Sequence, residues 1–245
     1  MSDLALDKKY KKGERGKKVR LIQEWLCLNG LGVCVDGEFG IATDYAVREF
    51  QKREGLKIDG IVGKRTFSRL ILPMTNALKP ISSDDKSLGE TVVAYAEQHL
   101  EKHPREIGGQ NKGPWVRLYM NGNEGQAWPW CAGFVCFILK QVCQNLGMPL
   151  PIKTSVSCDT LAASAEEKGS FLKESKVVDK TQITPGSFFL NRRTSADWIH
   201  TGIVVRAEDE VFETIEGNTN DEGSREGYEV CTRIRGYRKK DFILI

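Results

Sequence analysis

Seven cysteines and three histidines are the side chains of this 245-residue chain best suited to nucleophilic chemistry. Cys131 is distinctive because it closely follows Pro129 and precedes apolar residues at i+3, i+4, i+7, i+8 and i+11. That spacing predicts a buried helix whose first turn holds Cys131. Backbone N–H groups and the helix dipole lower a thiol pKa there and can stabilise an oxyanion. Cys131 is therefore the candidate nucleophile; the alternative is an inert cysteine in the core.

His200 is the histidine best placed to act as a base. It lies in a β-branched, apolar run over residues 199–205, and a similar run follows over residues 211–216. Both runs predict strands, and the polar residues 206–210 between them predict a hairpin turn.

The hairpin predicts a partner for His200. If the turn centres on Glu208, His200 and Glu216 become cross-strand neighbours with Cβ atoms about 5 Å apart. A carboxylate at that place fixes the imidazole tautomer through its second nitrogen. Asn218 points from the same face and is the alternative partner. A register slip of one residue would separate these side chains.

The other titratable residues predict no metal site and no cofactor. His99 and His103 are four residues apart but match neither HExxH nor HxxEH, so solvent-facing positions on a helix are expected. The cysteines form no CxxC pair and are expected to be reduced thiols. The polar residues 218–222 leave calcium binding open.

A repeat organises the first third of the chain. DGxxGxxT occurs at residues 36–43 and again at 59–66, and each copy is followed by a helical apolar pattern. Asp-Gly favours a tight turn, and the threonine favours a helix N-cap. With the apolar helix before the first copy, the pattern predicts a three-helix domain of about 60 residues.

Composition shifts divide the chain further. Residues 1–12 form a basic arm, 13–72 the repeat domain, 73–87 an aperiodic linker rich in proline and serine, and 88–245 a second domain. Residues 1–80 carry a net charge of +6 and the remainder −3. A basic arm can contact a polyanion, but a solvated terminus is the simpler interpretation and nucleic acid is not expected as a partner.

No apolar run reaches the roughly 20 residues of a membrane-spanning helix, so membrane insertion is not expected. The N-terminal residues lack the apolar stretch of a signal peptide. The sequence therefore predicts a soluble chain, assumed to be monomeric, that is made in the cytoplasm.

Residues 13–72 resemble the type 1 peptidoglycan-binding domain. The resemblance extends over DGEFGIATDYAVREFQKREGLKIDGIVGKRTFSRL and includes both copies of the repeat. It implies binding to bacterial peptidoglycan through a shallow groove.

Residues 88–245 resemble the CHAP domain (cysteine, histidine-dependent amidohydrolase/peptidase) of the papain-related NlpC/P60-like enzymes. The motifs are WCAGFV, HTGIVV and IEGN, with EIGGQNKGPWV and ITPGSFFL as supporting segments. The resemblance implies Cys131 as nucleophile, His200 as base, Glu216 as orienting carboxylate and Asn218 as accessory partner. The segment SADWIH stands where a small or glycine residue usually precedes the histidine, so Trp198 can narrow the cleft. Gln126 is the only amide close upstream of the nucleophile that could serve as a side-chain oxyanion donor.

Together the resemblances imply an α+β protein: a small three-helix N-terminal domain and a papain-like domain whose cysteine-bearing helix packs on an antiparallel sheet. The expected function is peptidoglycan hydrolysis, as an N-acetylmuramoyl-L-alanine amidase or a peptide endopeptidase. An endolysin-like enzyme would act on the wall after release from the cytoplasm. The alternatives are a non-catalytic wall-binding or structural protein and a secreted antibacterial effector with the same chemistry.

Overall fold

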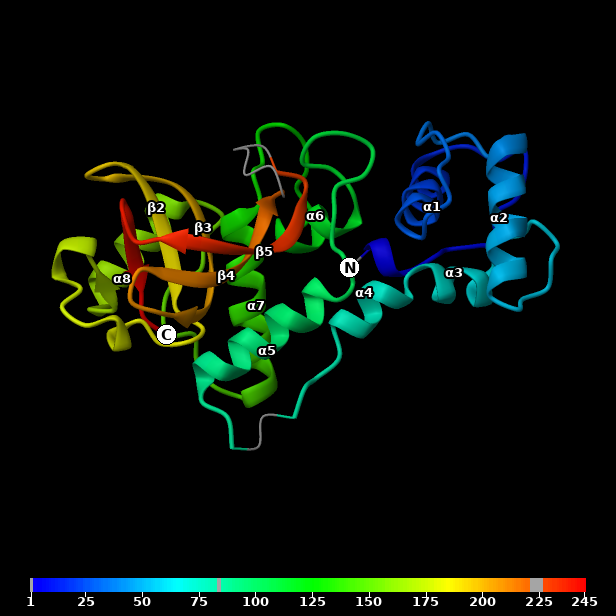
Figure 1. The fold of residues 1–245 in the computed structure, drawn as a ribbon. Helices are drawn as coiled ribbons and strands as arrows, with labels where there is room; N and C mark the ends of the chain where they lie inside the picture. Colours follow the sequence, from blue (N-terminus) through cyan, green and yellow to red (C-terminus); the bar gives the residue numbers. More distant parts are fainter. Residues whose placement is uncertain (1, 83–84, 221–226) are drawn as a thin grey trace.

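Helices occupy the first two thirds of the chain, and an antiparallel sheet occupies most of the last third (Figure 1). The computed structural model describes residues 2–82, 85–220 and 227–245. The helices are α1 (Lys17–Leu28), α2 (Ile41–Arg53), α3 (Lys64–Leu70), α4 (Leu72–Ala77), α5 (Leu88–Leu100), α6 (Pro114–Tyr119), α7 (Cys131–Leu146) and α8 (Cys158–Lys168). The strands are β1 (Phe171–Leu172), β2 (Phe188–Thr194), β3 (Asp197–Ala207), β4 (Val211–Thr219), β5 (Glu229–Gly236) and β6 (Lys240–Ile243).

A buried glutamine fixes the first copy of the repeat. Gln23 in α1 donates from Nε2 to Asp36 Oδ1 at 2.8 Å and to Thr43 Oγ1 at 3.1 Å. Its Oε1 accepts the backbone N–H of Gly37 at 2.7 Å. Gly37 has a φ of 81°, a conformation that glycine adopts without steric cost.

The second copy is fixed in the same way by Gln51 in α2. Its Nε2 donates to Asp59 Oδ1 at 3.0 Å and to Thr66 Oγ1 at 3.2 Å, and its Oε1 accepts the N–H of Gly60 at 3.0 Å. Each DGxxGxxT turn is therefore held by a glutamine from the preceding helix.

The predicted threonine N-caps are wrong. The N-cap positions of α2 and α3 are Gly40 and Gly63, and neither helix has a side-chain cap. Thr43 and Thr66 lie inside the first turns and are buried, with their hydroxyls bonded to the glutamine amides. The repeat is thus a buried hydrogen-bond network rather than a capping motif.

The stretch expected to be an aperiodic linker begins with a short helix, α4. Met74 and Ala77 are buried, and the carbonyl of Ala77 accepts hydrogen bonds from Gln98 at 2.9 Å and Gln141 at 2.8 Å. The basic arm is likewise not fully solvated, since Tyr10 is buried and its backbone pairs with Val62. Both segments contribute to the packing of the molecule.

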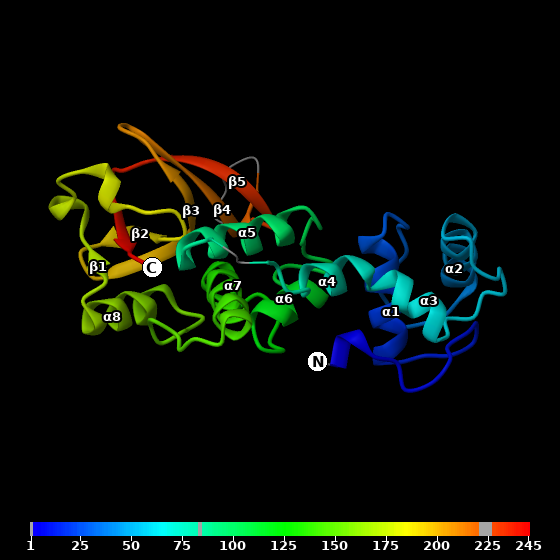
Figure 2. The same cartoon turned by 90° about the horizontal axis from the view of Figure 1, so that it is seen from below.

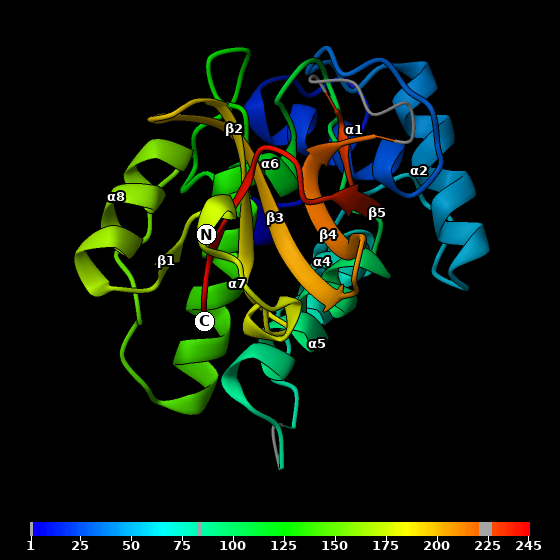
Figure 3. The same ribbon diagram turned by 60° about the vertical axis from the view of Figure 1, so that its left-hand side comes forward.

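The sheet has six antiparallel strands in the order β1-β6-β2-β3-β4-β5. Helix α7 packs against β3 and β4, and α8 packs against β3 and β1. Figures 2 and 3 show α5 and α7 side by side on one side of the curved sheet. The mixed α+β class, with a helical N-terminal region and an antiparallel sheet carrying the Cys131 helix, is therefore confirmed.

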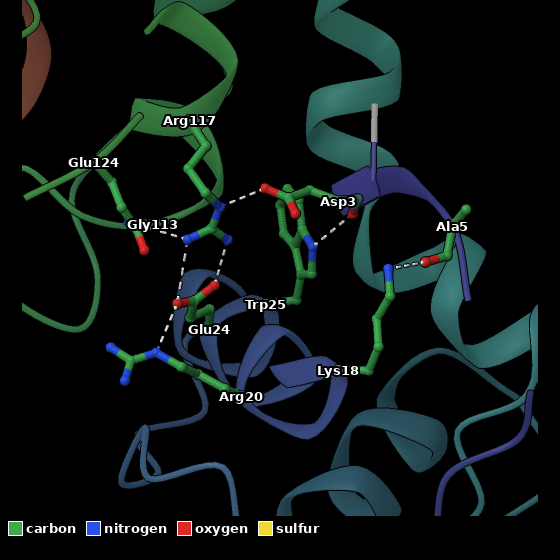
Figure 4. Close-up of polar contacts among 9 residues, drawn as sticks. All are labelled: Asp3, Ala5, Lys18, Arg20, Glu24, Trp25, Gly113, Arg117 and Glu124. Carbon is green, nitrogen blue, oxygen red and sulfur yellow. Dashed lines mark hydrogen bonds and ion pairs between the residues drawn. The ribbon is translucent and has the colours of Figure 1, made fainter. Parts of the chain in front are cut away.

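Arg117 in α6 forms ion pairs with three carboxylates, two of which are distant in the chain (Figure 4). Its Nε lies 2.6 Å from Asp3 Oδ2, its Nη2 2.6 Å from Glu24 Oε2, and its Nη1 2.6 Å from Glu124 Oε2. Asp3 belongs to the N-terminal segment and Glu24 to α1. We call the ion pairs of Arg117 with Asp3, Glu24 and Glu124 the Arg117 junction.

One continuous cluster of buried apolar side chains also extends from Tyr10 to Ile243.

No helix in the described parts of the chain combines the length and the apolar content needed to cross a bilayer.

Candidate active site

Cys131 is the first residue of α7, and its side chain is buried. The helix forms there because Phe134, Ile138 and further apolar residues give it one buried face. Trp130 occupies the N-cap position without a side-chain cap. The thiol therefore lies where the first-turn N–H groups of α7 are not engaged by a capping side chain.

His200 and Glu216 are brought together by β3 and β4. His200 Nε2 lies 2.7 Å from Glu216 Oε2, and the Glu216 side chain is fully buried. The predicted direct pairing of these residues is wrong by two positions, because Ile203 pairs with Ile215 and the ladder contains a bulge before Arg206. A shift of two preserves the face, so the two side chains still meet diagonally.

The Glu216 carboxylate has three partners. Besides His200, Thr214 Oγ1 donates to Oε1 at 2.6 Å. Arg235 in β5 donates from Nε to Oε1 at 2.8 Å and from Nη2 to Oε2 at 2.6 Å. Burial raises the pKa of Glu216, but Arg235 and His200 outweigh it and lower the pKa to about 2. The carboxylate is therefore ionised in the folded protein.

The Cys131 thiol is hydrogen-bonded to both Cys158 and His200. Hydrogen bonds with Cys158 and His200 hold the pKa of the Cys131 thiol well below its usual value, although burial acts in the opposite direction. Burial lowers the pKa of His200, but hydrogen bonds with Cys131 and Glu216 overcome this and raise it to about 9. At neutral pH the arrangement favours a thiolate beside an imidazolium.

Two glycines make room for this arrangement. A Cβ at Gly202 would lie 2.6 Å from Glu216 Cγ, so the carboxylate fits only because position 202 has no side chain. A Cβ at Gly217 would lie 2.7 Å from Phe134 Cβ, and its absence lets β4 approach the first turn of α7. The glycines of HTGIVV and IEGN thus have steric roles.

Asn218 lies beside this site in β4, but no bond to His200 is present. It is buried, has a φ of 55°, and sits at an irregularity in the pairing of β4 with β5. Its Oδ1 has no hydrogen-bond partner among the described residues. An accessory role for Asn218 stays a prediction.

Two residues near the site were not predicted from the sequence. The Cys158 thiol contacts Cys131, and this hydrogen bond together with burial raises the pKa of Cys158 well above its usual value. Like Cys131, Cys158 is the first residue of a helix, and that position was the signal available in the sequence. Arg235 alternates with β-branched residues along β5, and nothing in that pattern singled it out.

The aromatic and amide side chains that flank Cys131 and His200 in the sequence differ in their exposure. Trp115 and Trp130 are buried in the core, where Tyr119 stacks on both of them. Trp198 is half-buried and held by Asp241, to which its Nε1 donates at 2.9 Å. Gln126 is exposed.

The expectation that His99 faces solvent is wrong, whereas His103 is exposed as expected. His99 is fully buried, with its ring nitrogens 2.9 Å from Tyr119 Oη and from Gln141 Oε1, and burial lowers its pKa to about 4. Helix α5 ends at Leu100, so His103 lies beyond it. No group of three or more potential metal ligands occurs among the described residues. Of the possible calcium segment 218–222, residues 221 and 222 lie outside the described residues.

Comparison with known proteins assigns the helical repeat domain. Residues 15–70 match the family described as "Putative peptidoglycan binding domain". A zinc D-Ala-D-Ala carboxypeptidase of Streptomyces albus G is 34% identical over 73 residues, which are 29% of this chain and 29% of that protein. The chain thus spans less than a third of the curated relative it matches.

Two solved structures share sequence with the chain. The N-terminal domain of SleB is 35% identical and covers 27% of this chain and 93% of its own, with a TM-score of 0.27. A peptidoglycan-binding protein from Clostridioides difficile, solved with glutamine hydroxamate, is 40% identical and covers 29% and 42%, with a TM-score of 0.26. By the family match, residues 15–70 form a type 1 peptidoglycan-binding domain. The family match ends before the Cys131 site.

Proposed function

We propose that the protein is a peptidoglycan hydrolase in which residues 13–72 bind the wall and residues 88–245 form a CHAP-like cysteine amidohydrolase. The observation that carries the proposal is the chain of contacts from Cys131 through His200 to Glu216 at the start of α7. The family match over residues 15–70 supports peptidoglycan as the polymer. The name of the carboxypeptidase relative also supports a peptidase-type hydrolysis of the wall.

The proposed chemistry is acyl transfer. The Cys131 thiolate attacks an amide carbonyl carbon, and first-turn N–H groups of α7 stabilise the oxyanion. The C–N bond then breaks as the His200 imidazolium gives its proton to the leaving amine, which leaves a thioester. His200 next takes a proton from water, whose oxygen attacks the thioester and releases the acid and the thiolate. Glu216 keeps the imidazole in the orientation that both steps require.

The proposal is tested by digesting purified peptidoglycan with wild type, Cys131→Ala and Cys143→Ala. Cys143 lies on the same helix and serves as the matched control. We expect Cys131→Ala to lower fragment release at least about 1,000-fold, while Cys143→Ala stays near wild type. Mass spectrometry of the new termini distinguishes a muramoyl-alanine amidase from an endopeptidase.

A pelleting assay with the same peptidoglycan completes the experiment. All three proteins are expected to sediment with the wall, because the repeat domain is unchanged. If wild type pellets but releases nothing, the catalytic half of the proposal is wrong and a non-catalytic wall-binding protein takes its place.

A further inference from the structure

Arg235 is the strongest contact of the buried Glu216 carboxylate outside the Cys131–His200 pair. Its guanidinium donates to both carboxylate oxygens, at 2.8 Å and 2.6 Å, in the forked geometry that arginine forms with carboxylates. Thr214 also binds Oε1 and His200 binds Oε2. Together with the contacts from Arg235, these hydrogen bonds hold the carboxylate in a single orientation.

We propose that Arg235 is a positioning residue that holds Glu216 as an anion in the one orientation from which Oε2 accepts the His200 imidazole N–H. The inference deepens the proposed function and rests on it for the meaning of the site. The link itself consists only of side-chain contacts within this chain, so it is testable without any wall substrate.

The positive charge of Arg235 lowers the pKa of every neighbouring titratable group. A cation favours the deprotonated form of each nearby group, so removing it raises the pKa of Glu216, His200 and Cys131 alike. Within the described parts of the chain, the neighbouring charged or titratable groups include Cys136, Cys158, Cys231, Lys240 and Asp159. Lys240 is the one further cation among these, and burial lowers its own pKa.

The test measures alkylation of Cys131 by iodoacetamide against pH, with mass spectrometry of the peptide that contains this residue. The full-length protein is used as wild type, Arg235→Met and Arg235→Lys. Arg206→Met is the matched control, because Arg206 forms an exposed ion pair with Glu213 on the same sheet. The profile gives two midpoints, for formation of the thiolate and for loss of the His200 proton.

We expect Arg235→Met to move both midpoints upward by about 0.5–1 pH unit. Arg235→Lys keeps the cation and is expected to hold the midpoints near wild type, with slower alkylation because the fork is lost. Arg206→Met is expected to match wild type. Unchanged midpoints in Arg235→Met with a uniformly lower rate would show a merely structural role and overturn the inference.

Arg235→Gln, which removes the charge but keeps an amide donor, replaces Arg235→Met if that variant does not fold by near-ultraviolet circular dichroism. The same upward shift is expected, and its absence overturns the inference. If wild type releases no peptidoglycan fragments, the proposed function fails, but the alkylation midpoints still decide the role of Arg235.

Discussion

Glu216 lies between two cationic groups, His200 and Arg235, and these affect the site in opposite ways. The carboxylate stabilises the imidazolium, whereas the guanidinium neutralises part of the carboxylate charge. The pKa of His200, raised to about 9, is therefore a balance between them. Removing the carboxylate and removing the guanidinium should therefore shift the pKa of His200 in opposite directions.

Glu216→Gln is expected to lower the pKa of His200 by about 1–2 units, because the imidazolium loses its anionic partner. Nuclear magnetic resonance titration of the His200 ring measures this shift. In wild type, the raised pKa stabilises the fold fully below about pH 6.5, and this contribution is lost as pH rises through about 9. Glu216→Gln should therefore lose most stability below about pH 6.5, where this contribution is complete in wild type. An unchanged or raised His200 pKa would contradict the assigned contact.

The sequence predicts part of this site. Cys131 is recognisable because apolar spacing marks the start of its helix, and His200 and Glu216 because two strand patterns flank one turn. Arg235 is not recognisable, because it alternates with Ile234 along β5 and the apolar isoleucine, not the arginine, takes the exposed face, with 69% of its surface accessible. A buried carboxylate determines which strand face is polar, and a pattern within one strand does not contain that information.

At the scale of elements, two glutamine clamps make the repeat a structural unit. We use this name for the hydrogen bonds of Gln23 and Gln51 to the two DGxxGxxT turns. The sequence predicts the turns correctly from Asp-Gly, but it does not predict the clamps, because Gln23 and Gln51 lie in helices that precede the motifs. Helix α4 was also missed, since its six residues are stabilised by burial of Met74 and Ala77 rather than by periodicity.

Gln51→Leu is expected to destabilise the protein by about 2–4 kcal/mol. The substitution leaves the Gly60 N–H and other buried polar groups of the second turn without partners. Gln23→Leu should cost a similar amount, because its contacts are equivalent. Urea denaturation measures both, with the exposed Lys52→Ala on α2 as control. A loss below about 0.5 kcal/mol in both variants would contradict the importance of the clamps.

At the scale of the whole molecule, the Arg117 junction connects the repeat domain to the rest of the chain. Arg117→Met is expected to lower the free energy of unfolding by about 3–5 kcal/mol, because Glu24 stays buried without its strongest partner. Burial already raises the pKa of Glu24 in wild type. Chemical denaturation measures the loss, and Arg206→Met, which breaks only two exposed ion pairs, should change the free energy of unfolding by less than about 1 kcal/mol.

A second substitution separates the charge effect from lost packing. Glu24→Gln in the Arg117→Met background removes the unpaired buried charge and is expected to recover most of the stability. If the double variant is as unstable as Arg117→Met, packing rather than charge dominates the junction.

The Arg117 junction also determines how far Cys131 can lie from the repeat domain when, on the proposed function, that domain is bound to the wall. A flexible segment as long as residues 73–87 would let its ends drift roughly 20 Å apart, and a nucleophile carried on it would sample every bond within that radius. Helix α4 and the Arg117 contacts instead hold Cys131 at a fixed offset from the repeat domain. On the proposed function, each anchoring event exposes only the bonds at that offset, so digestion advances at the rate at which the anchor releases and rebinds.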